Sequence, residues 1–285
     1  MFPAEIFSEI FSFLASDARV LVACSQAHPT FAQLIEPILY AHVIVHNRNV
    51  DDEDEDHLKL NPYQLSTALS GNPRVQNHLR SLRVELSGVY SNDVKEMTTI
   101  LPRLKLERIQ LTFAPSVNFV DWRSFPIAFR TAFVACISTP SMKEIFLDDI
   151  YNTPLSLFSD CAGLKRLTLF SYATPPSNIS CNFPQLEDLE LSYWTMDDSR
   201  LFPWMLTHAS GLRSLTFTTV WKSSMCGFLP HLLSICSTSL VNLSIYYLGH
   251  CKPMYPSTHI VLTLSYSTGV GRHTYRDRFP RPPEP

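Results

Sequence analysis

Glycine is scarce in this chain, which has 8 glycines among 285 residues. Phosphate-binding loops need glycine where the backbone approaches the ligand, and neither GxxxxGK[ST] nor GxGxxG is present. The GxSxG nucleophile elbow and the HExxH zinc pair are also missing. We therefore expect that the chain is not an enzyme. An enzyme with an unrecognised site stays open as an alternative, because serine, histidine and aspartate are plentiful enough to form a triad.

A basic excess and a long apolar run are missing as well. The 23 lysines and arginines stand against 26 acidic residues, for a net charge of −3. A basic excess is the usual mark of nucleic-acid binding, so we expect no nucleic-acid partner. No window of 18 apolar residues occurs, so we expect no membrane span. Glu5 and Glu9 near the start, without a basic region, predict no secretory signal.

Clustered metal ligands are missing too. The seven cysteines are widely spaced, with no CxxC pair. This usage favours reduced thiols and a location in the cytoplasm or the nucleus. His42 and His46 are four residues apart, but no third ligand is near in sequence, so we interpret them as surface histidines. We expect no metal and no cofactor.

What the chain does contain begins with a compact helical segment, and residues 1–46 predict a small all-α domain of three helices. Pro3 suits a first helical position, Asp17 is a cap signal for a second helix, and Pro29 opens a third. The first helix carries a broad apolar stripe through Ile6, Ile10, Phe13 and Leu14, with Phe7 and Phe11 widening it. Three helices in about 40 residues make a small core, so the domain needs something to pack against.

An acidic run follows this segment. All six residues from 51 to 56 are aspartate or glutamate. Like charges repel, which predicts a solvated linker over residues 47–60.

From residue 61 a pattern of apolar-x-x-apolar-x-apolar recurs seven times. Its middle apolar residues are Leu82, Ile109, Ile145, Leu167, Leu189, Leu215 and Leu243. The mean step is about 27 residues, within the range of leucine-rich repeats. Between the windows, six segments indicate helices: 62–70, 93–101, 124–138, 154–161, 198–209 and 225–237.

Alternating strands and helices predict an α/β fold with parallel strands and helices behind them. We interpret residues 61–251 as an irregular leucine-rich-repeat solenoid, and an ordinary α/β domain is the alternative. In residues 252–285 the alternation around Ile260, Leu262 and Leu264 predicts an edge strand, and the composition of 269–285 predicts a disordered tail.

The N-terminal segment resembles an F-box. Residues 2–14 read Phe-Pro-Ala-Glu-Ile-Phe-Ser-Glu-Ile-Phe-Ser-Phe-Leu, close to the usual Leu-Pro-x-Glu-Ile/Leu opening of that family. Residues 20–32 are similar to its second helix and following turn, and 34–43 to the closing stretch of many fungal members. Phe2 replaces the usual leucine. A leucine-rich array behind an F-box is a recurrent arrangement in this family.

The resemblance implies a function. F-box proteins dock on a Skp-type adaptor of a cullin–RING (SCF) ubiquitin ligase, and their C-terminal repeats hold a protein substrate for ubiquitination. A scaffold that binds partners without a ligase is the alternative. By matching positions, the resemblance implies these adaptor-binding residues: Phe2, Pro3, Ile6, Ile10, Leu14, Leu21 and Cys24.

Strand alternation predicts where the substrate binds. If Leu189 and Leu191 face the core, then Glu190 faces the opposite, concave side. The same phase exposes Arg83, Gln110, Phe146, Asp148, Thr168, Phe170, Thr216 and Tyr246. Exposed aromatic residues are typical anchors of protein interfaces. We expect a protein substrate across Phe146, Phe170, Tyr193, Trp194, Trp221 and Tyr246.

Overall fold

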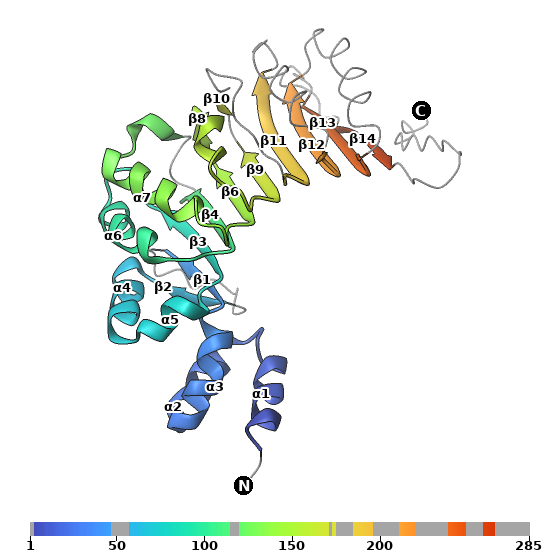
Figure 1. Cartoon of the computed structure of the whole chain (residues 1–285). Helices are drawn as coiled ribbons and strands as arrows, with labels where there is room; N and C mark the ends of the chain where they lie inside the picture. The colour runs from blue at the N-terminus through green and yellow to red at the C-terminus, as the bar shows by residue number, and fades with distance from the viewer. Residues whose placement is uncertain are drawn as a thin grey trace, which may run out of the picture.

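A curved sheet forms the body of the molecule in the computed structural model (Figure 1). The structure describes residues 3–46, 57–114, 120–170, 173–174, 185–195, 211–220, 239–248 and 259–265. Among them, ten strands form the main sheet in the order β14-β13-β12-β11-β9-β6-β4-β3-β1-β2. All neighbours in it are parallel except β13 and β14. The predicted α/β class with parallel strands is confirmed.

The strands of this sheet are short, and seven of the ten lie in the predicted windows. Their bounds are β1 His42–Val45, β2 Leu58–Leu60, β3 Ser81–Leu86, β4 Arg108–Phe113, β6 Glu144–Asp148, β9 Arg166–Phe170, β11 Asp188–Thr195, β12 Ser214–Val220, β13 Asn242–Leu248 and β14 His259–Ser265. Two small parallel pairs accompany it, β5 Val120–Asp121 with β7 Ile150–Tyr151, and β8 Thr153–Pro154 with β10 Ala173–Thr174.

The middle residue of each window lies in register with its neighbours. Leu82 pairs with Ile109, and the row continues through Ile145, Leu167, Leu189 and Leu215 to Leu243. Every member of this row is at most 3% exposed. Buried branched side chains at one register position of successive parallel strands form a continuous apolar layer, as the windows predict.

The described helices cover one face of the sheet in its part from β1 to β6 (Figure 1). They are α4 Pro62–Gly71, α5 Pro73–His78, α6 Asn92–Ile100 and α7 Ile127–Ile137, with 3-10 turns η1 Leu101–Arg103, η2 Trp122–Ser124 and η3 Leu155–Phe158. The helices predicted at 62–70, 93–101 and 124–138 are present, whereas 154–161 contains only the 3-10 turn η3. The segments 198–209 and 225–237 lie outside the described residues.

Local sequence explains where α4 and α7 lie. Asn61 and Gln64 form a reciprocal capping box, with two hydrogen bonds of 2.8 Å that satisfy the first amides of α4. Phe125, Phe129 and Phe133 recur every four residues, are fully buried, and stack with ring centroids 4.9 and 6.4 Å apart. This aromatic column fixes α7 against the sheet.

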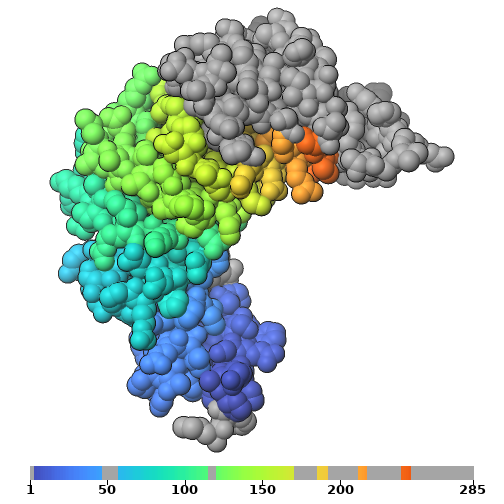
Figure 2. Space-filling view, viewed as in Figure 1, coloured from blue at the N-terminus to red at the C-terminus, as the bar shows by residue number. Residues whose placement is uncertain are grey.

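A separate helical unit stands at one end of the sheet (Figure 2). It comprises α1 Ala4–Phe13, α2 Ala18–Ala27 and α3 Pro29–Leu39. Asp17 caps α2 by accepting from the amide of Val20 at 2.9 Å. The unit has its own small core of Phe11, Ala18, Leu21, Ile35 and Leu39.

The sheet begins earlier in the chain than the boundary predicted at residue 46. His42–Val45 is strand β1, and it lies between β2 and β3. Leu58–Leu60, assigned to the linker from the sequence, is strand β2. Val43 and Val45 are buried in the sheet core. Residues 42–45 therefore belong to the sheet and not to the helical segment that precedes them. This corrects the predicted domain limits; the acidic run itself lies outside the described residues.

At the other end of the sheet, β14 pairs antiparallel with β13 and forms an edge of the described sheet. This confirms the strand predicted around residues 260–264. The tail predicted to be disordered, residues 269–285, lies outside the described residues.

Candidate functional site

Helix α1 carries two apolar stripes that face in different directions. Phe7, Phe11 and Leu14 face the core of the helical unit, where Phe7 and Phe31 have ring centroids 4.9 Å apart. Ile6, Ile10 and Phe13 lie at i, i+4 and i+7, and are 42%, 46% and 80% exposed. Residues at this spacing share one helix face. The second stripe is therefore an exposed apolar surface, which we call the α1 stripe.

The structure separates the predicted adaptor-binding residues into three groups. Pro3, Ile6 and Ile10 are exposed. Leu14 and Cys24 are half-buried and pack against the core of the helical unit. Leu21 is 1% exposed and belongs to that core, so its placement on the surface is corrected.

Phe2 lies outside the described residues. Phe13 is the most exposed member of the α1 stripe, yet sequence analysis assigned it to one broad stripe with Leu14. Its spacing of seven from Ile6 is the signal that identifies its true face.

A pocket of about 400 Å³ lies where the helical unit meets the first strands. It is lined by Ala15, Ser16, Ala18, Leu21, Ile38, Leu39, Ala41, His42, His57 and Leu58. The rings of His42 and His57 lie 6.0 Å apart at 84°. Burial, then the charges of His57 and Arg108, lower the pKa of His42. Among the described residues, no group of three histidine, cysteine or acidic side chains is placed to hold a metal ion.

The second candidate surface is the sheet face turned away from the helices, which we call the open face. It carries the side chains that alternate with the buried leucines. Arg83 is exposed there, and Gln110, Phe146 and Glu190 are half-buried, as the alternation predicts. Thr168 is only 4% exposed. Its predicted exposure is therefore corrected.

The predicted substrate-binding residues are only partly covered by the described structure. Phe146 on β6 lies on the open face, opposite Thr168 of β9. For Phe170, Tyr193, Trp194 and Tyr246 the structure describes the strand but not the side chain, and Trp221 lies outside the described residues. The pairing of β11 with β12 shifts register between Leu191 and Trp194, so strict alternation does not continue from Glu190 to Trp194.

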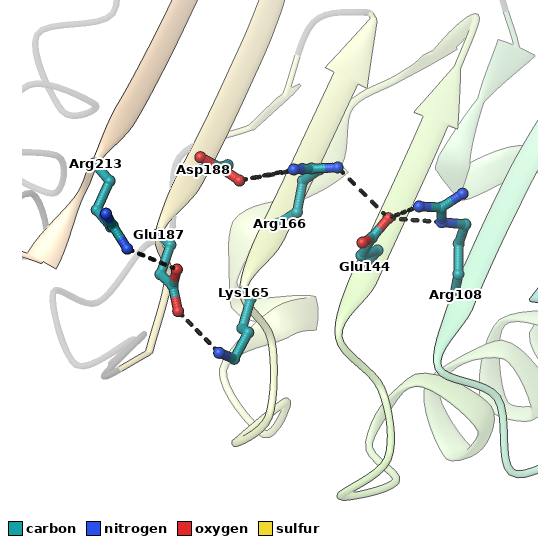
Figure 3. A network of polar contacts seen from close by, with 7 residues as sticks. All are labelled: Arg108, Glu144, Lys165, Arg166, Glu187, Asp188 and Arg213. Carbon is teal, nitrogen blue, oxygen red and sulfur yellow. Dashed lines mark hydrogen bonds and ion pairs between the residues drawn. The ribbon is translucent and has the colours of Figure 1, made fainter. Parts of the chain in front are cut away.

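Charged side chains form a row along the start of the strands on the open face (Figure 3). Arg108 donates from Nε to Glu144 at 2.6 Å, and the same carboxylate lies 3.8 Å from Arg166. Arg166 then donates to Asp188 at 3.2 and 3.0 Å. The hydrogen bond to Asp188 is the main cause that raises the pKa of Arg166. Signs alternate along this row, so its charges neutralise one another.

A second row of charges lies one residue earlier in each window. Glu187 lies 2.9 Å from Lys165 and 4.0 Å from Arg213 (Figure 3). Lys143 and Glu107 form the equivalent pair at 2.6 Å. A hydrogen bond from lysine is the main cause that lowers the pKa of both Glu107 and Glu187.

Other acidic groups of the sheet have raised pKa values. Burial raises the pKa of Asp148, and the neighbouring charge of Asp149 adds to it. Burial also raises the pKa of Glu190, although a hydrogen bond from Thr168 and the charge of Arg166 oppose it. These carboxylates lie beyond the neutralised row, in surroundings that solvate them poorly.

Two cysteine thiols among the described residues, Cys136 and Cys161, are poor nucleophiles. Burial raises the pKa of Cys136 and of Cys161 to about 12, so both stay protonated at neutral pH.

Within the described part of the chain, no helix is both long and apolar enough to cross a membrane. In comparisons with known proteins, no protein-family model matches the chain, and no curated protein matches it.

Proposed function

We propose that this protein is the substrate-recognition subunit of an SCF-type ubiquitin ligase, with residues 3–39 as an F-box that docks a Skp-type adaptor. The α1 stripe carries this proposal, because Ile6, Ile10 and Phe13 remain exposed although the helix already packs through another face. Fully burying one such side chain is worth about 1.5–3 kcal/mol. A partner that covers the stripe therefore gains several such contributions.

The sheet supports the second half of the proposal, a leucine-rich-repeat solenoid that holds a protein substrate. From β3 to β13 the strands of the sheet follow chain order, parallel and in the same register. Its open face offers Phe146 among polar side chains, which is a typical composition for a protein interface. Substrate recruitment would then act by proximity, since tethering commonly raises effective concentration into the millimolar range.

Adaptor co-purification tests the proposal. In the full chain, Ile6→Asp combined with Ile10→Asp places two charges on the α1 stripe without altering the buried stripe, so adaptor binding is expected to disappear. Ser12→Asp is the matched control, because Ser12 lies exposed on the same helix outside both stripes. Circular dichroism checks that all variants stay helical.

Unchanged adaptor binding by the double variant would overturn the ligase function. It would favour the alternative of a ubiquitin-independent interaction scaffold, in which the same surfaces bind other partners.

A further inference from the structure

Phe146 lies between two carboxylates on the open face. Asp148 is two residues further along β6 and on the same side, so by strand geometry the Cα atoms of Phe146 and Asp148 are about 6.6 Å apart. Glu190 shares the cross-strand row of Phe146, and Thr168 lies between them. Two strand spacings place the Cα atoms of Phe146 and Glu190 about 10 Å apart. An arginine side chain lying over the Phe146 ring reaches either carboxylate at these distances.

Along β3 to β12, the carboxylates of the open face outnumber the cations that are not already paired within the row. Arg108 and Arg166 are held in the neutralised row by Glu144 and Asp188 (Figure 3). Beyond that row, the described open-face side chains of β3 to β12 include one cation and three carboxylates. They are Arg83, Glu85, Asp148 and Glu190.

The surroundings of the two carboxylates favour a cation from outside. A backbone hydrogen bond from Asp149 and the charge of Arg83 lower the pKa of Asp148, but burial and the charge of Asp149 outweigh them. Burial raises the pKa of Glu190 by more than the hydrogen bond from Thr168 and the charge of Arg166 lower it. A poorly solvated carboxylate gains more from a charge-assisted hydrogen bond than one in bulk water. An aromatic ring beside it adds a cation–π contact.

We propose that the open face around Phe146 binds an arginine- or lysine-containing segment of an unmodified protein substrate. The inference rests on the proposed role of the chain as a substrate receptor and names the class of segment it takes. Charge complementarity identifies the occupant: a basic side chain lies over Phe146 and pairs with Asp148 or Glu190. A phosphorylated segment fits poorly, because Arg108 and Arg166 are already paired and carboxylates outnumber the one remaining cation of β3 to β12.

Fluorescence anisotropy with three labelled 12-residue peptides tests this on the full chain. The peptides share a Ser-Gly background and carry three arginines, three glutamates or three phosphoserines. The arginine peptide is expected to bind about tenfold tighter than either other peptide, as one charge-assisted hydrogen bond would give. Asp148→Asn with Glu190→Gln is expected to remove most of that preference. Glu187→Gln is the matched control, because its carboxylate pairs within the second row.

Equal binding of all three peptides, binding of none, or tighter binding of an acidic one would overturn the inference. An arginine preference that the double variant leaves unchanged would also overturn it. Adaptor co-purification is measured on the same preparations. If the adaptor is retained while the arginine preference is missing, only this inference fails; if the adaptor is lost, the proposed function fails instead.

Discussion

Arg166 on β9 donates a hydrogen bond of 3.0 Å to Asp188 on the neighbouring strand β11. The two residues are 22 positions apart and occupy the same place in successive windows. Arg108 and Glu144 make the equivalent contact although 36 positions separate them. The longer repeat therefore leaves strand register intact, and its extra residues include β5 and η2.

Reversing charges in this row tests how much it stabilises the sheet. Arg166→Asp and Asp188→Arg are each expected to lower the free energy of unfolding, because each places like charges opposite one another. Combining them restores an opposite-charge pair, with a coupling energy of about 0.2–1 kcal/mol, since both side chains are partly exposed. Urea denaturation of the four proteins measures this, and the coupling should shrink in 1 M salt. Coupling near zero at low salt would contradict a stabilising row.

The buried leucines should contribute more to the free energy of unfolding than this charged row does. Leu167→Ala or Leu189→Ala removes a side chain from the continuous apolar layer and is expected to cost about 2–5 kcal/mol. Lys165→Ala, at the exposed position just before β9, is expected to cost less than about 1 kcal/mol. Equal denaturation midpoints for Leu167→Ala and Lys165→Ala would contradict the assigned core.

The pKa of Glu190 predicts an unusual dependence of stability on pH. Burial raises this pKa in the folded protein, so ionisation of Glu190 lowers stability as pH rises through the raised value. Glu190→Gln keeps an oxygen acceptor for Thr168 and avoids that cost. The substitution is expected to raise the free energy of unfolding at pH 7 by less than about 1 kcal/mol. The gain should vanish as pH falls below the usual glutamate value of 4.5.

Glu187→Gln is the matched control with the opposite sign. A lowered pKa means that ionised Glu187 favours the folded state above its usual value of 4.5. The substitution should therefore lower stability at pH 7 and lose its effect as pH falls through the lowered pKa. Thermal unfolding between pH 3 and pH 7 separates the two behaviours. A destabilising Glu190→Gln at pH 7 would show that burial is not the dominant cause there.

Much of the fold is readable from local sequence, because the information lies within each window. The spacing of Leu164, Leu167 and Leu169 fixes a strand with one buried face, and the same holds in the other windows. Phe125, Phe129 and Phe133 likewise identify one helix face in a short stretch. These patterns need no knowledge of distant residues.

Other features depend on neighbours that are remote in sequence. Helix α1 has two apolar stripes, and only contact with Phe31 of α3 decides that Phe7 and Phe11 are buried while Ile6 and Ile10 stay exposed. Strand β1 is a strand because β2 and β3 pair with it on both sides.

The charge balance of the open face is decided in the same way. The sequence by itself determined which residues alternate toward that face, since alternation is a property of one strand. Only the tertiary structure decided that Glu144 pairs with both Arg108 and Arg166, leaving Asp148 and Glu190 beyond the row. The physical reason is that a charge interacts with whatever lies within a few ångströms, and strand pairing brings together residues 22 to 36 positions apart.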